Sequence, residues 1–284
     1  MYTLIAQNKF GQQLELTHND AYVIEDIDGL DPPDATINTT RNANADGSVF
    51  NSSYVNNRQV IITMAINGPA ENNRIQLYKY FKNKYPVRLF YQNNTRQVYI
   101  DGYCKNIDIS FFNQKQIAQI TIVCPQPFFC RSNNTIIDFS SIESLFEFPF
   151  SVEDPPGDIE FSEILLDQVE NLINTGDVET GLEMYIRALG PLTDPVIYNT
   201  ETNEYFKLDL SMAKGDEVYI NTKKKEKTVE FTHNGATTNI LSNLVNGSTW
   251  FQLQPGDNLF SATAVSNPEN VSVYCIITDL FEGV

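Results

Sequence analysis

Alternation of apolar and polar positions is the main pattern in the first half of the chain. Residues 22–27 are rich in β-branched and aromatic types, and residues 58–66 (RQVIITMAI) form an apolar run. Asp-Gly at 28–29 and Pro-Pro at 32–33 break the chain between them. The pattern predicts short strands joined by turns, with residues 58–66 as a buried strand.

A polar stretch, TTRNANADGSVFNSSYVNNR (residues 39–58), leads into this run. Asp46-Gly47 is its sharpest turn signal, and no hydrophobic face is evident along it. Two interpretations stay open: a mobile loop, or an extended hairpin that needs a partner to become ordered.

One helix is predicted in this half, over residues 70–84 (AENNRIQLYKYFKNK). Pro69 suits the first helical turn, lysines follow in the last turn, and Pro86 stops the helix. Residues 93–95 and 113–115 carry turn signals between β-rich segments and predict two hairpins.

The second half alternates more regularly. Residues 182–189 (LEMYIRAL) are apolar at every second position, and turn signals recur along the chain, which predicts an antiparallel β-sandwich. Before it, residues 146–158 (FEFPFSVEDPPGD) are predicted to be a linker or an irregular edge. Residues 161–173 fit neither the helical nor the strand period, and we favour a strand there.

Charge also divides the chain. The net charge is −17, and nearly all of it lies in residues 134–284, which hold 25 Asp and Glu against seven Lys and Arg. Two domains, residues 1–133 and 134–284, are therefore predicted. The second lacks the cations that would hold nucleic acid. No signal-peptide pattern and no apolar run of about 18 residues occur, so we expect no membrane insertion.

Residue types that carry catalysis are sparse. His18 and His233 both lie in turn-like sequence, which favours solvated side chains over a catalytic base. The nucleophile-elbow, zinc-protease, P-loop and dinucleotide motifs are absent. Paired carboxylates for glycoside hydrolysis stay conceivable in so acidic a chain, but no pair is singled out. We expect no enzyme and no cofactor.

Four cysteines raise the question of a metal or redox site. Cys124 and Cys130 flank two prolines in ITIVCPQPFFC (residues 120–130), with no histidine nearby. Structural zinc needs four ligands at tight spacing, so no metal site is predicted. Cys104, Cys124 and Cys275 are instead expected to pack in strands as small hydrophobic residues.

Aromatic residues in the second half allow a binding role. Trp250, Tyr198 and Tyr205 could supply stacking surfaces for sugars, which gives a carbohydrate-binding module as the alternative function. Trp250 lies at strand spacing from Leu253, a placement more typical of a core residue.

Several phrases in order extend over nearly the whole chain. They are IDGLDPPDATINTT (27–40), DGSVFNSSYVNNRQVIITMAING (46–68), ITIVCPQPFF (120–129), NTGDVETGLEMYI (174–186), WFQLQPGDNLF (250–260) and FEGV (281–284). Their order and spacing resemble the distal tail protein family of long-tailed, siphovirus-type bacteriophages. No single phrase is specific for the family, but the set is. On this resemblance the prolines after Cys124 mark the end of the first domain.

The resemblance implies a mainly β protein. It implies an N-terminal β-sandwich-like ring domain with one α-helix and a long hairpin, followed by a C-terminal galectin-like antiparallel β-sandwich. The family forms a hexameric ring at the distal end of the tail, between the tail tube and the tail-tip hub, and carries receptor-binding or baseplate proteins. DNA would meet it only in transit, and the protein would be part of the virion, assembled in the host cytoplasm. The residues expected at a subunit interface or the lumen are Arg41, Asp46, Gly47, Ser48, Tyr54 and Arg58.

Overall fold

The computed structural model describes residues 2–43, 46–113, 115–139, 142–143, 163–164 and 169–284. The predicted linker at 146–158 lies outside these residues, as does part of the predicted strand at 161–173. Contacts divide the chain into two compact units, Asn134–Asp279 and Met1–Asn133 together with Leu280–Val284. The division after Asn133 lies where the charge pattern places it. The last five residues differ from the expectation, because they belong to the first unit.

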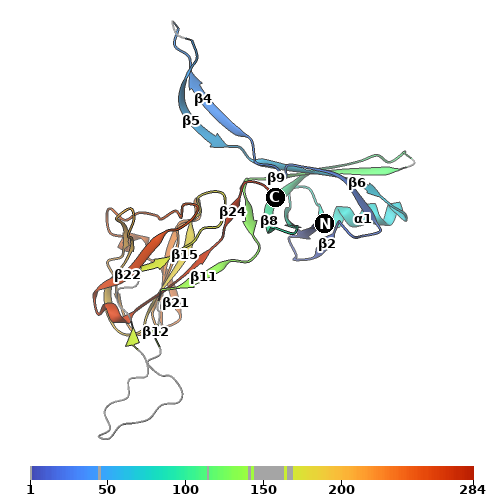
Figure 1. Cartoon of the computed structure of the whole chain (residues 1–284). Coiled ribbons are helices and arrows are strands. Elements are labelled where there is room, and N and C mark those ends of the chain that lie inside the picture. Colours follow the sequence, from blue (N-terminus) through green and yellow to red (C-terminus); the bar gives the residue numbers. More distant parts are fainter. Residues whose placement is uncertain (1, 44–45, 114, 140–141, 144–162, 165–168) are drawn as a thin grey trace. The chain divides into compact units, whose positions relative to one another are not determined.

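The first unit is built on a nine-stranded antiparallel sheet (Figure 1). Its main order is β2-β1-β7-β8-β9-β6-β3, with β10 paired to β8 and to β24. The strands are β1 (Thr3–Asn8), β2 (Gln13–Glu15), β3 (Tyr22–Asp28), β6 (Arg58–Ile66), β7 (Pro86–Gln92), β8 (Gln97–Ile109), β9 (Gln116–Cys124), β10 (Phe129–Arg131) and β24 (Leu280–Phe281).

Alternate residues of these strands form the first core. Val60, Ile62 and Met64 of β6 are buried, whereas the residues between them are half-buried, so the predicted buried strand is confirmed on one face. Helix α1 (Ala70–Tyr80) adds Leu77 to the same core. The helix ends before residue 84, where the sequence placed its end. The two predicted hairpins share the single long strand β8.

The second unit is a sandwich of two antiparallel sheets. One has the order β11-β23-β15-β19-β20-β21, and the other has β14-β22-β16-β17 with β18 beside β16. The strands are β11 (Thr135–Asp138), β14 (Val169–Asn171), β15 (Leu182–Ala188), β16 (Leu192–Asn199), β17 (Glu204–Lys207), β18 (Ser211–Met212), β19 (Glu217–Asn221), β20 (Thr228–His233), β21 (Ala236–Asn239), β22 (Leu259–Ser266) and β23 (Val271–Ile277).

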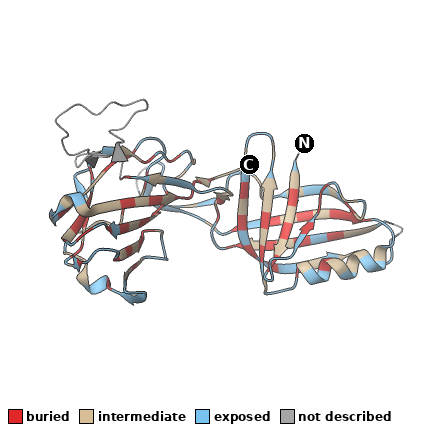
Figure 2. Ribbon diagram, turned by 90° about the horizontal axis from the view of Figure 1, so that it is seen from below, coloured by how far each residue is buried: buried red, intermediate tan, exposed pale blue. Residues whose placement is uncertain are grey.

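Both sheets of the second unit contribute to one core. Met184 and Cys275 come from the six-stranded sheet, and Phe206 and Phe260 come from the other. Figure 2 shows buried and exposed residues along the strands of the two units. A separate short pair, β12 (Ile142–Glu143) and β13 (Glu163–Ile164), completes the described strands of this part. The mainly β fold is confirmed.

Candidate functional site

A two-stranded hairpin projects from the nine-stranded sheet of the first unit and forms a sheet of its own (Figure 1). Its strands are β4 (Ala35–Thr40) and β5 (Val49–Val55). Every residue of β5 is exposed, and all of β4 is exposed except the half-buried Thr36. Of the two interpretations left open by the sequence, the hairpin is therefore correct. A lone two-stranded hairpin is marginally stable in water, so this one needs support from outside its own strands.

On one face of the hairpin, side-chain hydrogen bonds connect the two strands. Asn38 Nδ2 donates to Ser52 Oγ at 3.0 Å, and Asn51 Nδ2 donates to Thr40 Oγ1 at 2.6 Å. We call this the hydrogen-bonded face; it comprises Thr36, Asn38, Thr40, Val49, Asn51, Ser52 and Tyr54. Because its polar groups pair with one another, it is the more self-sufficient face.

The opposite face is mainly apolar, with Thr39 and Ser53 as its polar members. Strand register places Ala35 opposite Val55, Ile37 opposite Ser53, and Thr39 opposite Phe50, and opposed residues point to the same side. These six residues are the apolar face. Ile37 is 65% exposed, Phe50 61% and Val55 38%.

A β-bulge explains why this apolar face was missed in the sequence. Phe50 and Val55 are five positions apart, so strict alternation puts them on opposite faces. The register shifts between Asn38 and Thr39, which leaves Asn51 as an extra residue on β5. The extra residue moves Phe50 to the side of Val55. The expectation of a hairpin without a hydrophobic face is therefore wrong.

Five of the six predicted interface or lumen residues lie on the hairpin or its tip. Arg41, Asp46, Gly47 and Ser48 are exposed in the connection between β4 and β5. Tyr54 is 57% exposed on the hydrogen-bonded face. Their exposure fits a contact surface, while their role there stays a prediction.

Arg58 departs from that expectation. It is only 3% exposed, so its side chain is not available on the surface of the single chain. Its guanidinium donates to four backbone carbonyls at the root of the hairpin, those of Gly29, Asp31, Pro127 and Glu282. The structure thus places Arg58 as an internal anchor.

In the second unit, the three residues proposed for sugar stacking do not form one platform. Tyr198 and Tyr205 are cross-strand neighbours with ring centroids 6.5 Å apart, and Tyr198 is 39% exposed. Trp250 instead packs edge-on against the buried Phe206 at 5.4 Å. Only the two tyrosines are therefore available together.

A row of three other tyrosines was not foreseen. Tyr185 pairs with Tyr219 on one side and Tyr274 on the other, and the Tyr185 and Tyr274 rings stack at 4.5 Å with 3° between their planes. Tyr219 donates to Glu183 at 3.1 Å. Because neighbouring rings cover each other's faces, the row offers edges and hydroxyls rather than open faces for a sugar. Burial raises the pKa of all three hydroxyls above the usual value for tyrosine.

With this geometry in place, comparison with protein-family models gives two matches. Residues 175–274 match the siphovirus-type tail component, C-terminal domain, and residues 9–124 match the phage tail protein RIFT-related domain. The chain belongs to the distal tail family of siphovirus-type tail components. The resemblance noted in the sequence is confirmed, and the protein is a component of a phage tail.

Solved structures show the same fold for this tail component. The crystal structure of phage SPP1 Dit, described as a paradigm of the hub adsorption apparatus in phages infecting Gram-positive bacteria, aligns with a TM-score of 0.70 at 13% identity, over 99% of each chain. A chain of the phage P2 baseplate in its activated conformation with Ca aligns with a TM-score of 0.58 at 14% sequence identity, over 100% of each chain. No curated protein matches by sequence.

The residues weighed for chemistry have structural surroundings in this tail component. Cys104, Cys124 and Cys275 are buried in or at the end of strands, as predicted. Burial raises the pKa of Cys104 to about 11 and of Cys124 to about 12, which makes them poor nucleophiles. His233 is exposed, but it is not simply solvated, because its Nδ1 lies 2.7 Å from the buried Asp216.

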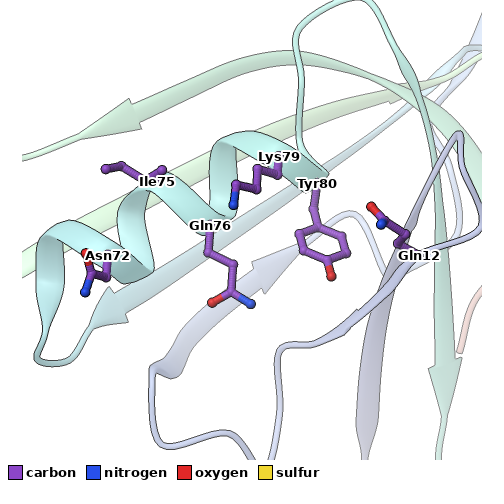
Figure 3. A pocket seen from close by; sticks show the side chains of 6 residues that line it. All are labelled: Gln12, Asn72, Ile75, Gln76, Lys79 and Tyr80. Atoms are coloured by element: carbon purple, nitrogen blue, oxygen red, sulfur yellow. The ribbon is translucent and has the colours of Figure 1, made fainter.

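The part of the chain that the structure describes holds no group of three or more His, Cys, Asp or Glu side chains placed to bind a metal. Nor do those residues include a helix long and apolar enough to span a membrane. A hollow of about 470 Å³ lies between α1 and the β1–β2 turn (Figure 3). Amides, an isoleucine, a lysine and a tyrosine line it, with no carboxylate or thiol, so we assign it no reaction.

Proposed function

We propose that this tail component forms a hexameric ring at the distal end of the tail. The ring would join the tail tube to the tail-tip hub and serve as the platform for receptor-binding or baseplate proteins. DNA would pass through it only in transit, and assembly would take place in the host cytoplasm.

The apolar face of the β4–β5 hairpin is the observation that carries this proposal. Ile37 and Phe50 are more than half exposed, and among the residues that the structure describes no other strand pairs with the hairpin. Burying such a face against another molecule is favourable, since apolar surface removed from water stabilises the contact. A second copy suits this role, because repeating one heterologous contact around an axis closes a ring with no hairpin left unpaired.

The charge of the first unit supports the transit of DNA. Residues 1–133 hold nearly balanced numbers of acidic and basic side chains, and several of the basic ones are already paired within the unit. Such a surface would not retain phosphates, whose binding depends on clustered Lys and Arg. A strongly basic first unit would have argued for holding DNA instead.

The molecular mass of the protein in solution tests directly whether the ring forms. Light scattering of the full chain over a concentration series, followed by negative-stain imaging, should reveal a sixfold species with a central hole. The same measurements with the tail-tip hub protein added test whether the hub promotes the ring. A monomer at every concentration, with and without the hub, would refute the proposal.

Carbohydrate binding by the second unit is a second candidate. It rests on Tyr198 and Tyr205, whose rings lie side by side with Tyr198 exposed. Aromatic faces of this kind stack on sugars. A glycan array with the full chain tests this candidate. Sugars that bind the wild-type chain should no longer bind Tyr198→Ala. If no sugar on the array binds the wild-type chain, the candidate function is refuted.

A further inference from the structure

Arg58 donates hydrogen bonds to four carbonyls in three separate segments of the first unit. Its Nε donates to the carbonyl of Pro127 at 2.6 Å, and its Nη1 donates to those of Gly29 and Asp31, each at 2.6 Å. Its Nη2 donates to the carbonyl of Glu282. A guanidinium has a rigid fork of donors, so these acceptors are held in a fixed arrangement.

Two of these contacts lie on the segment that leads into the hairpin, and Arg58 itself lies just beyond the hairpin's end. Gly29 and Asp31 precede β4, and Arg58 itself opens β6, three residues after β5 ends. Between them, the backbone N–H of Asn56 donates to the carbonyl of Asp34 at 2.9 Å and closes the root of the hairpin. The guanidinium therefore ties the segment that leads into β4 to Arg58, which follows β5.

The fourth contact comes from residues 280–284, which we call the returning segment. Phe281 pairs with Phe129 across β24 and β10 and is only 5% exposed. The guanidiniums of Arg96 and Arg131 lie 4.5 and 5.5 Å from the Phe281 ring. This segment belongs to the first unit although the whole second unit precedes it in the chain.

The returning segment also reaches the hairpin's entry. The backbone N–H of Val284 donates to the carbonyl of Leu30 at 3.2 Å, between the two residues that Arg58 binds. If the segment were absent, a buried guanidinium donor would lose its acceptor, which is costly for a charged group. The order at the hairpin root thus depends on residues 224 positions further along the chain.

We propose that Arg58 and the returning segment position the root of the β4–β5 hairpin, so that the hairpin is presented for assembly only once residues 280–284 have docked. Arg58 is a positioning residue: it acts through the hairpin and does not touch the neighbouring subunit. The assembly part of this inference rests on the proposed ring, whereas the positioning part concerns the single chain alone.

Hydrogen exchange on the full chain tests the positioning. Arg58→Lys keeps the charge but loses the fork, and Phe281→Ala loosens the same root from the returning segment. We expect each to speed exchange of the Asn56 amide by about tenfold or more, the effect of losing one hydrogen bond to a charged group. The amides of the β7–β8 ladder should stay protected. Arg88→Lys, on the same sheet and paired with Asp101 at 2.7 Å, is the matched control and should change neither region.

The outcomes separate the two proposals. Unchanged exchange at the hairpin root in both variants overturns the positioning role, and so does a rise spread over the whole nine-stranded sheet, which marks a purely structural role. Faster exchange confined to the root, with fewer rings by light scattering, supports it. Rings that survive loss of the apolar face of the hairpin overturn the ring contact instead, without touching the exchange result.

Discussion

Replacing the two most exposed residues of the apolar face is the most direct perturbation of the ring. Ile37→Asn with Phe50→Asn removes the side chains that are 65% and 61% exposed in the single chain. Complete burial of an Ile or Phe is worth about 1.5–3 kcal/mol, so covering three-fifths of each in a neighbour gives about 1–2 kcal/mol. Together the two account for about 2–4 kcal/mol per contact, or a dissociation constant raised about 30- to 1,000-fold.

Single-molecule mass measurement over a dilution series gives the concentration at which the rings dissociate, and this concentration should rise in the variant. Asn38→Ala with Ser52→Ala is the matched control, because these residues lie on the same strands but on the hydrogen-bonded face. The control should leave that concentration nearly unchanged. Thermal unfolding of the monomer should move by no more than about 2 °C in the apolar-face variant, since exposed side chains contribute little to the isolated fold. A normally folded variant that dissociates at the wild-type concentration would refute the reasoning.

Three further changes test the single chain. Gly29→Ala should lower the free energy of unfolding by about 2 kcal/mol or more, because φ is +88° and the added Cβ would lie 2.0 Å from a backbone oxygen. Gly47→Ala is the control: its φ is +87° but the space around it is open, so the cost should be about 1 kcal/mol. Chemical denaturation measures both values. The raised pKa values of Cys104 and Cys124 imply stability that is intact below about pH 9 and lost as pH rises towards 11–12, because only the unfolded thiols ionise early. The melting temperature should therefore fall between pH 9 and 11, and a flat profile contradicts this. Trp250→Ala should destabilise the folded protein by about 2 kcal/mol through lost core packing. A melting temperature equal to that of the wild type would contradict a packing role for Trp250.

Local alternation explains which parts of the fold could be predicted. In β15, and in β9 from Ala118 onward, every second residue is buried, and the pattern is visible in the sequence without knowledge of the partner strand. Cys124 is the last buried position of β9, with prolines beyond it that cannot continue the ladder, so its structural role followed from the same pattern. These inferences depend only on neighbouring residues.

Features set by register could not be reached in this way. The apolar face of the hairpin requires the bulge at Asn51, and the tyrosine row requires Tyr185 to stand opposite both Tyr219 and Tyr274. Each tyrosine was recognisable as an outward position of its strand. That the three are neighbours follows only from the order β23-β15-β19 in the sheet.

Arg58 is different, because the sequence did contain the relevant signal. It stands at the first position of RQVIITM, in phase with Val60, Ile62 and Met64, and strict alternation turns it towards the core with them. The resemblance to the tail family instead placed Arg58 at a subunit interface or the lumen. An arginine in phase with buried positions needs several acceptors to offset its desolvation. Such a residue therefore predicts a junction of loops and chain ends around it, here between the entry to the hairpin and residues 280–284.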